Sequence, residues 1–225
     1  MTFDLDSSKN DTLAYRIAEL IRQNILIGEY LSGERIIEFK LSKALEVSQN
    51  TIRDALHLLE QAGWVIKKPR RGVYVREFTL KEIDEIFELA LRIESLAITQ
   101  MIQNLTKSGF AKLRAHIEAA RSSRQQFLRS PAIQSLMSFH FEVARLSNTT
   151  FTSRWLEYLY IQITLLEVLR QRRNPVSMEE LDIFIKAHQE LLDAVEKRDE
   201  MRALNDLHSL ITAYRNLLKY NTSRI

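Results

Sequence analysis

The sequence predicts a mainly α-helical protein. An N-terminal winged helix-turn-helix of three helices and a β-hairpin wing precedes an all-α helical bundle of about six helices. The distribution of glycine predicts the boundary between these two domains. Four of the five glycines separate short elements in the first third of the chain: Gly28, Gly33, Gly63 and Gly72. Beyond residue 79, apolar residues at helical spacing predict packed helices. We therefore assign residues 1–76 to the first domain, 77–79 to a linker and 80–225 to the second domain.

The first helix is predicted by apolar residues at helical spacing: Leu13, Ile17, Leu20, Ile21 and Ile25. Asp11 or Thr12 can cap its N-terminus, and Gly28 can end it. We expect the residues before Asp11 to be loose.

Two shorter helices complete the helix-turn-helix. One is expected from about Glu38 to Leu45, and after the turn at Glu46 and Val47 the next helix begins at Ser48, which can cap it. This third helix ends before Gly63. Its apolar residues share one face: Ile52, Ala55, Leu56 and Leu59. The opposite face carries the residues that can meet a partner: Gln49, Asn50, Arg53 and His57.

A basic hairpin follows the third helix. Residues 64–66 and 73–75 are β-prone, and the six residues between them form a basic tip. The ten residues from Lys67 to Arg76 contain no acid and five cations: Lys67, Lys68, Arg70, Arg71 and Arg76. Such a run by itself indicates a solvated loop, but directly after a helix-turn-helix it predicts a wing.

The second domain has well-marked helix starts. Thr79-x-x-Glu82 and Ser177-x-x-Glu180 match capping boxes, and Ser130-Pro131 combines a cap with proline at the first helical position. Breaks near 106–109, 130–131, 147–150, 174–175 and 198–199 divide residues 79–220 into about six helices. We expect no strand in this domain.

Composition narrows the class of protein. The chain has 225 residues, no cysteine, no apolar run of about 18 residues and no signal-peptide pattern, so we expect a cytoplasmic protein without a membrane partner. The net charge of +3 alone does not establish nucleic-acid binding. The sequence lacks a cysteine nucleophile, a glycine-rich phosphate loop, His-Glu-x-x-His and Gly-x-Ser-x-Gly, so we do not expect an enzyme.

The N-terminal end of the third helix carries side chains that can read DNA, because this end of a helix-turn-helix enters the major groove. Gln49 and Asn50 can each bond two atoms of adenine. Ser48 and Thr51 can bond phosphates or bases, and Arg53 can bond a phosphate or a guanine. The alternative is an ordinary amphipathic surface helix, and the basic hairpin favours DNA binding.

Residues 13–75 resemble the DNA-binding domain of the GntR family of transcriptional regulators. The matching motifs are Ile25-Leu26-x-Gly28, Ser32-Gly33-Glu34-Arg35, Val47-Ser48-x-x-Thr51-Ile52-Arg53-Asp54-Ala55-Leu56, Leu59-Glu60-x-x-Gly63-Trp64-Val65 and Arg71-Gly72-Val73-Tyr74-Val75. The helical remainder resembles the ligand-binding domain of the FadR-like subfamily, the FCD type. The resemblance implies a regulator that responds to a small molecule.

The resemblance also implies a set of DNA-binding residues: Phe39, Lys43, Ser48, Gln49, Asn50, Thr51, Arg53, Lys67, Lys68, Arg70, Arg71 and Gly72. The family commonly has base-contacting arginines where this chain has Phe39 and Gln49. We therefore expect an operator that differs from the usual one, with adenine favoured opposite Gln49.

The resemblance implies an effector pocket that includes Glu94, Leu136, His140, His188 and Leu210. Many FadR-like regulators hold a divalent metal with one aspartate and three histidines. Two of these ligands match His140 and His188, whereas Leu136 and Leu210 occupy the other two positions, and His208 is expected to point elsewhere. No metal cofactor is therefore required.

The two histidines can be hydrogen-bonded core residues, or they can bind an organic effector. Ala90 stands where an arginine is common, one turn before Glu94. With leucine at two further positions, we expect a more apolar effector, or none.

For function, we expect a homodimer that binds double-stranded operator DNA as a repressor, with activation left open, and a small organic effector that changes the binding. The alternative is a constitutive architectural protein whose helical domain only forms the dimer. A sensor should have a polar-lined cavity around His140 and His188, whereas a pure dimerisation domain should fill that space with leucine and isoleucine.

Overall fold

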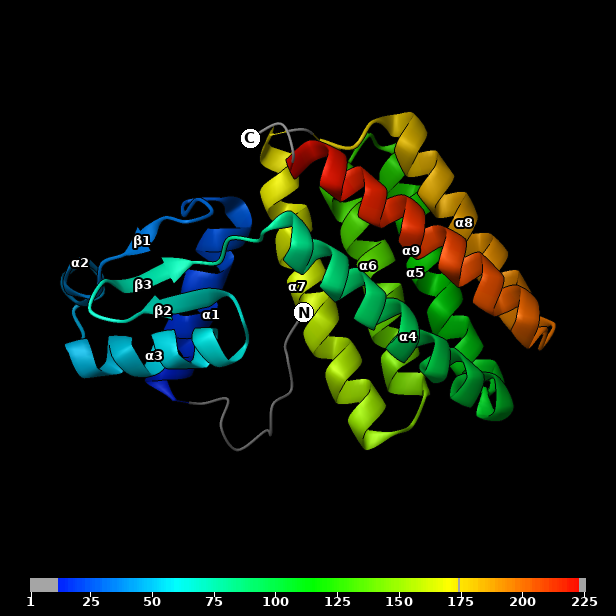
Figure 1. The fold of residues 1–225 in the computed structure, drawn as a ribbon, viewed down its shortest axis with the longest axis horizontal. Helices are drawn as coiled ribbons and strands as arrows, with labels where there is room; N and C mark the ends of the chain where they lie inside the picture. The colour runs from blue at the N-terminus through cyan, green and yellow to red at the C-terminus, as the bar shows by residue number, and fades with distance from the viewer. Residues whose placement is uncertain (1–11, 174, 223–225) are drawn as a thin grey trace. The chain divides into compact units, whose positions relative to one another are not determined.

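The computed structural model describes residues 12–173 and 175–222, and they form two compact units. The first extends to Glu77 and the second begins at Phe78, within the segment predicted to be the linker. The expectation for the residues before Asp11, and the cap by Asp11, lie outside the described residues. Figure 1 shows the elements of both units in chain order.

The first unit is the predicted winged helix-turn-helix. Its helices are α1 (Leu13–Ile27), α2 (Glu38–Ala44) and α3 (Gln49–Gln61), and its strands are β1 (Arg35–Ile36), β2 (Val65–Lys68) and β3 (Gly72–Val75). Thr12 caps α1 by accepting a hydrogen bond from the Tyr15 N–H, and Gly28 ends the helix in the left-handed conformation, with φ of 80°. Ser48 caps α3, as predicted, by accepting the Thr51 N–H.

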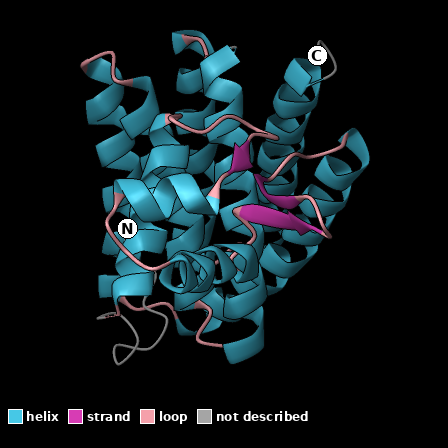
Figure 2. Ribbon diagram, turned by 90° about the vertical axis from the view of Figure 1, so that its left-hand side faces the viewer, coloured by secondary structure: helices cyan, strands magenta, loops and turns pink. Residues whose placement is uncertain are grey.

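The sheet contains one strand that the sequence analysis missed. The antiparallel order is β1-β3-β2, and the three strands lie side by side (Figure 2). Strand β1 has two residues, too few to show the alternating pattern of a strand. It forms because Arg35 and Ile36 pair with Tyr74 and Val73 in β3.

The wing differs from its prediction in one respect. Lys67 and Lys68 were assigned to the tip with Gly72, but antiparallel pairing continues as far as Lys68 and Gly72, so all three belong to the strands. The tip is a tight turn closed by the Arg71 N–H, which donates to the Lys68 carbonyl at 3.0 Å. Pro69 and Arg70 are its central residues, and the positive φ of Arg70, 60°, fits the third position of a type II turn.

The second unit is a bundle of six helices in the described residues, which contain no strand there. The helices are α4 (Leu80–Asn104), α5 (Lys107–Gln125), α6 (Arg129–Leu146), α7 (Thr150–Arg173), α8 (Met178–Glu196) and α9 (Glu200–Thr222). Both predicted capping boxes are present. Helix α4 packs against α6, α7 and α9, and α8 packs against α5, α6 and α9. The interior between them holds the second unit's core.

The predicted start of α6 is wrong by two residues. The helix begins at Arg129, and its N-cap is Leu128, which makes no side-chain capping bond, instead of Ser130. Pro131 is therefore the third helical residue. This position tolerates proline because the first N–H groups of a helix have no carbonyl acceptor within the helix.

No described helix is both long enough and apolar enough to cross a membrane.

Candidate nucleic-acid interface and buried polar cluster

Helix α3 presents a polar face to solvent because its apolar face is anchored in the core. Ile52, Ala55, Leu56 and Leu59 are buried, and α3 packs on α1. Gln49, Asn50, Arg53 and His57 are exposed. The predicted division of the helix into two faces is confirmed, whereas the contacts of these side chains with DNA stay predictions.

Arg53 is held by side chains from two helices. Its Nε–H donates to Oε2 of Glu38, in the first turn of α2, at 2.9 Å. Its Nη1 lies 3.4 Å from Oδ1 of Asn50. Glu38 was not predicted as a site residue, because an acid in the first turn of a helix is common and its spacing from Arg53 carries no pattern.

The exposed side of α2 carries an aromatic ring beside a cation. The Phe39 side chain is 53% exposed, and Lys43 places its Nζ 4.6 Å from the centre of the ring. Both predicted DNA-binding residues of α2 are thus accessible. They lie on the helix whose first turn contacts Arg53.

The wing exposes most of its predicted cations. Lys67, Arg70 and Arg71 are exposed, whereas Lys68 is half-buried, with its Nζ 3.9 Å from the Glu77 carboxylate. Gly72 has a φ of 107°, and a Cβ there would lie 2.9 Å from Nε of Arg35. The left-handed backbone conformation therefore favours glycine at position 72, and a side chain there would also displace the end of Arg35.

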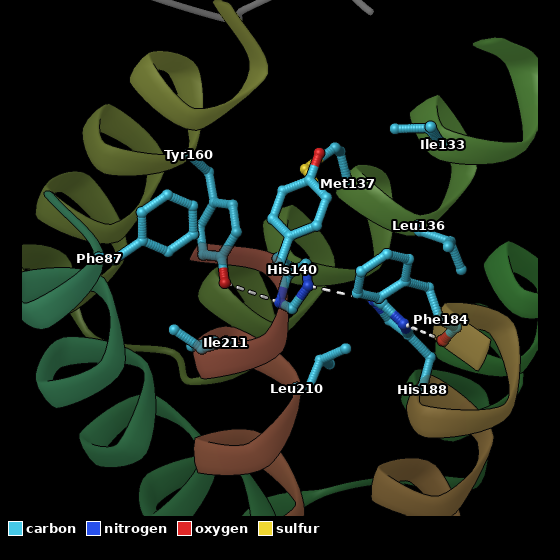
Figure 3. A pocket seen from close by; sticks show the side chains of 11 residues that line it. Phe87, Ile133, Leu136, Met137, His140, Tyr160, Phe184, His188, Leu210 and Ile211 are labelled. Atoms are coloured by element: carbon cyan, nitrogen blue, oxygen red, sulfur yellow. Dashed lines mark hydrogen bonds between the residues drawn. The ribbon is translucent and has the colours of Figure 1, made fainter. Parts of the chain in front are cut away.

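Four polar side chains from four helices meet inside the second unit. We call Glu94 of α4, His140 of α6, Tyr160 of α7 and His188 of α8 the buried polar cluster. His140 Nδ1 lies 2.7 Å from Oε1 of Glu94, and the Tyr160 hydroxyl donates to Oε2 of Glu94. His140 and His188 meet through their Nε2 atoms at 3.2 Å, and His188 Nδ1 lies 2.7 Å from the Phe184 carbonyl oxygen. Figure 3 shows His140 between Tyr160 and His188.

The hydrogen-bond partners determine where the protons of the cluster lie. Because a carbonyl only accepts, His188 Nδ1 carries a proton and donates it to Phe184. Burial and the neighbouring His140 lower the pKa of His188 to about 3, so its ring is neutral and its Nε2 accepts from His140. His140 Nδ1 and the Glu94 carboxylate can lie this close only if one of them carries a proton, so we place one proton between them. Every N–H and O–H group of the cluster has a partner.

Burial and the carboxylate of Glu94 raise the pKa of Tyr160 well above its ordinary value. The phenol therefore stays protonated and remains a donor to Glu94.

The cluster borders a small cavity. Its volume is about 20 Å³, which is room for about one water molecule. The cavity brings together four of the residues predicted for the effector pocket, Leu136, His140, His188 and Leu210. Glu94 is not in its wall and contacts His140 from behind. The rest of the wall is apolar and aromatic: Phe87, Ile133, Met137, Tyr160, Phe184, Ile211 and Tyr214.

These residues do not fit a divalent metal. Besides His140 and His188, the two positions that the resemblance assigns to ligands are the hydrocarbon side chains of Leu136 and Leu210. The Glu94 carboxylate contacts His140 Nδ1, the nitrogen on the other side of the ring from His188. His208 is exposed, as predicted from its place on the helix. Among the described residues, no three His, Cys, Asp or Glu side chains are grouped to hold a metal ion.

A second buried polar group consists of an ion pair within α7 and a tyrosine of α9. Arg170 donates to Glu167 through Nε at 2.9 Å and through Nη2 at 2.5 Å, and the Tyr214 hydroxyl donates to Glu167 at 2.5 Å. The sequence did not predict this group. Charged residues in a helix indicate an exposed face, and only the apolar residues on the other faces of α7 could have signalled that this face is buried too.

Comparison with known proteins agrees with this architecture. The model for bacterial regulatory proteins of the gntR family matches residues 13–75, and the FCD domain model matches residues 85–213. The HTH-type transcriptional regulator YdhC of Bacillus subtilis is 24% identical over 184 residues, or 81% of this chain and 80% of YdhC. The HTH-type transcriptional regulator McbR of Escherichia coli is 23% identical over 193 residues, or 85% of this chain and 86% of McbR.

Solved structures show the same fold. The structure of E. coli McbR/YncC aligns with a TM-score of 0.78 at 20% identity and covers 92% of this chain and 97% of that one. A GntR regulator from Rhodococcus sp. RHA1 aligns with a TM-score of 0.77 at 19% identity, covering 91% and 96%. The chain therefore belongs to the GntR family of bacterial transcriptional regulators, with an FCD domain behind its winged helix-turn-helix.

Proposed function

We propose that this chain is a homodimeric, metal-independent repressor that binds a pseudo-palindromic operator and responds to a small apolar effector. The observation that carries DNA binding is the exposed polar end of α3, with Gln49, Asn50 and Arg53 beside a wing that exposes Arg70 and Arg71. A helix end of this kind can enter the major groove, and the wing cations can contact phosphates.

Recognition of a long DNA site favours a dimer. One recognition helix reads only a few base pairs, so two copies related by a two-fold axis double the site and match two half-sites. We therefore expect a pseudo-palindromic operator with two similar half-sites.

The buried polar cluster supports effector binding in the helical unit. Burying Glu94 and two histidines costs desolvation energy, and apolar side chains of similar volume could fill the same space. Groups of this kind inside a domain mark candidate ligand sites. Because the cluster joins α4, α6, α7 and α8, a ligand that separates its members changes the packing of four helices.

The chemistry of the wall favours an apolar effector. All N–H and O–H groups of the cluster are already used, so a ligand would meet mainly hydrocarbon and aromatic surface. The cavity has room for about one water molecule. A larger ligand must therefore displace the flexible side chains of Leu136, Met137 or Leu210.

The small cavity also favours the second candidate, a constitutive DNA-binding dimer. In that case the helical unit serves only for dimerisation, and the cluster is a satisfied part of its core. This candidate predicts an operator affinity that no small molecule changes.

Selection from random duplex DNA tests DNA binding, with fluorescence anisotropy to measure the affinity of the selected sequences. We expect a two-fold symmetric site with adenine opposite Gln49 or Asn50. A pool that shows no enrichment after selection would contradict sequence-specific binding.

Native mass spectrometry with elemental analysis tests the oligomeric state, the metal content and the presence of a bound ligand. A metal-free dimer with an apolar ligand of defined mass supports the sensor, and a metal-free dimer whose operator affinity stays unchanged across a ligand panel supports the constitutive candidate. Stoichiometric zinc or nickel would contradict the metal-independent site, and a monomeric mass bound to one half-site would contradict the dimer.

A further inference from the structure

Glu38 is an acid on the surface that is expected to face DNA. Arg53 of α3 contacts it, and Lys40 and Lys43 are exposed on the same helix. A carboxylate in this position repels phosphates and lowers the affinity for every DNA sequence. A role for Glu38 in DNA binding therefore has to come from a contact that favours one DNA sequence over others.

The geometry around Arg53 indicates that benefit. The guanidinium has five N–H donors in a rigid plane. Glu38 accepts the one on Nε, and Asn50 accepts one on Nη1. Three donors remain, one on Nη1 and two on Nη2. A guanidinium whose other donors are held in this way can use them for the two acceptors of a guanine edge or for a phosphate.

Glu38 is itself held in place. The turn between the helices is closed by backbone bonds, with the Val47 N–H donating to the Ser42 carbonyl at 3.0 Å. Ser42 is buried, so α2 is seated against α3. The packing of α2 therefore fixes the position from which the Glu38 carboxylate contacts Arg53. This contact restricts the long Arg53 side chain before DNA binds, so that less conformational freedom is lost on binding.

We propose that Glu38 is a positioning residue for sequence readout: it orients the Arg53 guanidinium and exchanges general DNA affinity for operator specificity. The proposal rests on the proposed binding of operator DNA through α3. It predicts effects of opposite sign on two kinds of DNA, which neither simple repulsion nor a structural role predicts.

Glu38→Ala should weaken binding to the selected operator about tenfold, since Arg53 loses its orientation. The same change should strengthen binding to a scrambled duplex about two- to threefold, since a repulsive charge is gone. Glu38→Gln should keep operator binding, because its amide oxygen can still accept the Arg53 Nε–H.

Asp54→Asn is the matched charge control. Asp54 is exposed on α3, next to Arg53 in sequence, and its substitution removes the same charge. It should strengthen binding to both duplexes by a similar small factor. Affinities for both duplexes are measured by fluorescence anisotropy at two salt concentrations, and melting temperatures are measured alongside.

Glu38→Ala in an Arg53→Ala background decides whether the effect passes through Arg53. The proposal expects no further loss of operator affinity there. It is overturned if Glu38→Ala strengthens operator and scrambled DNA equally, as Asp54→Asn should, or if its loss persists without Arg53.

Glu38 is also in the first turn of α2, where Ile37 provides no side-chain cap, so its charge can stabilise that helix. If Glu38→Ala lowers the melting temperature, Glu38→Gln, which keeps the hydrogen-bond acceptor, replaces it in the comparison. Equal loss on operator and scrambled DNA would then assign a structural role. If the unsubstituted protein itself does not prefer its operator, the proposed function fails, and that outcome is distinct from those above.

Discussion

The two units each contain a contact between a glutamate and a cationic or ionisable side chain, and the two contacts differ in exposure. Glu38 and Arg53 have exposed side-chain fractions of 31% and 58%, whereas those of Glu94 and His140 are 0% and 4%. The first contact leaves guanidinium donors for a partner. The second lies in a cluster whose donors are all used within the protein.

This difference determines what each contact contributes. An exposed ion pair is screened by water and salt and adds about 0–1 kcal/mol to stability. A buried pair contributes little by itself compared with an apolar replacement, but removal of one partner leaves the other buried and unpaired. We therefore expect substitutions at the surface contact to change DNA binding, and substitutions in the buried cluster to change folding.

The largest effect should come from Glu94→Ala. It removes the carboxylate from His140 Nδ1 and the Tyr160 hydroxyl, which lie 2.9 Å apart and can still bond each other, and it leaves a cavity in the core, so we expect the free energy of unfolding to fall by about 2–4 kcal/mol. Urea unfolding followed by circular dichroism measures it, with Glu38→Ala as the exposed counterpart. A loss below about 1 kcal/mol would mean that water reaches the cluster, in contrast to the burial in this structure.

Arg53→Ala should show the opposite pattern. Operator binding should weaken by about 1–3 kcal/mol, because a base or phosphate contact is lost. The free energy of unfolding should change by less than about 0.5 kcal/mol, as expected for an exposed side chain. Anisotropy titration and urea unfolding of the same preparation test both statements. Normal operator affinity would show that α3 docks on DNA in another way.

Acid should affect the buried region through His188. Its pKa is lowered to about 3 in the folded protein and lies near 6.5 in the unfolded chain, so between these values the unfolded state binds more protons. The contribution of neutral His188 to stability is therefore fully present above about pH 6.5. Below that value the free energy of unfolding falls by about 1.4 kcal/mol per pH unit.

Urea unfolding at about pH 7, 6 and 5 measures this loss. His188→Gln, which cannot take up the proton, should show a shallower dependence on pH. Equal slopes in the two proteins would rule out His188 as the titrating group.

The smallest effect concerns the wing. Arg71→Gln removes one exposed cation, and the slope of log K against log salt should become shallower by about 0.9. The loss of affinity should be similar for operator and scrambled duplexes. A change in preference between the duplexes would instead assign base readout to Arg71.

Local signals in the sequence predicted most elements correctly. The caps Thr12 and Ser48, the left-handed Gly28 and both capping boxes act within four residues, so sequence spacing alone reveals them. Strand β1 gave no such signal, because two residues become a strand only through a partner strand far along the chain. The start of α6 was misplaced because proline is tolerated at several positions in a first turn.

The candidate sites were only partly predictable. The exposed face of α3 followed from helical periodicity, and His140 and His188 were singled out through the resemblance. Glu38 and Tyr160 were missed, since nothing in their local sequence shows that their side chains meet Arg53 and Glu94.

The sequence by itself determined the order of the helices, most of their caps and the faces that they bury, because these depend on interactions within one or two helical turns. Only the tertiary structure decided which polar groups pair. Glu94 and His140 are 46 residues apart, and Tyr160 is 66 residues from Glu94. Their contact depends on how α4, α6 and α7 pack, and that packing is set by the summed burial of many side chains.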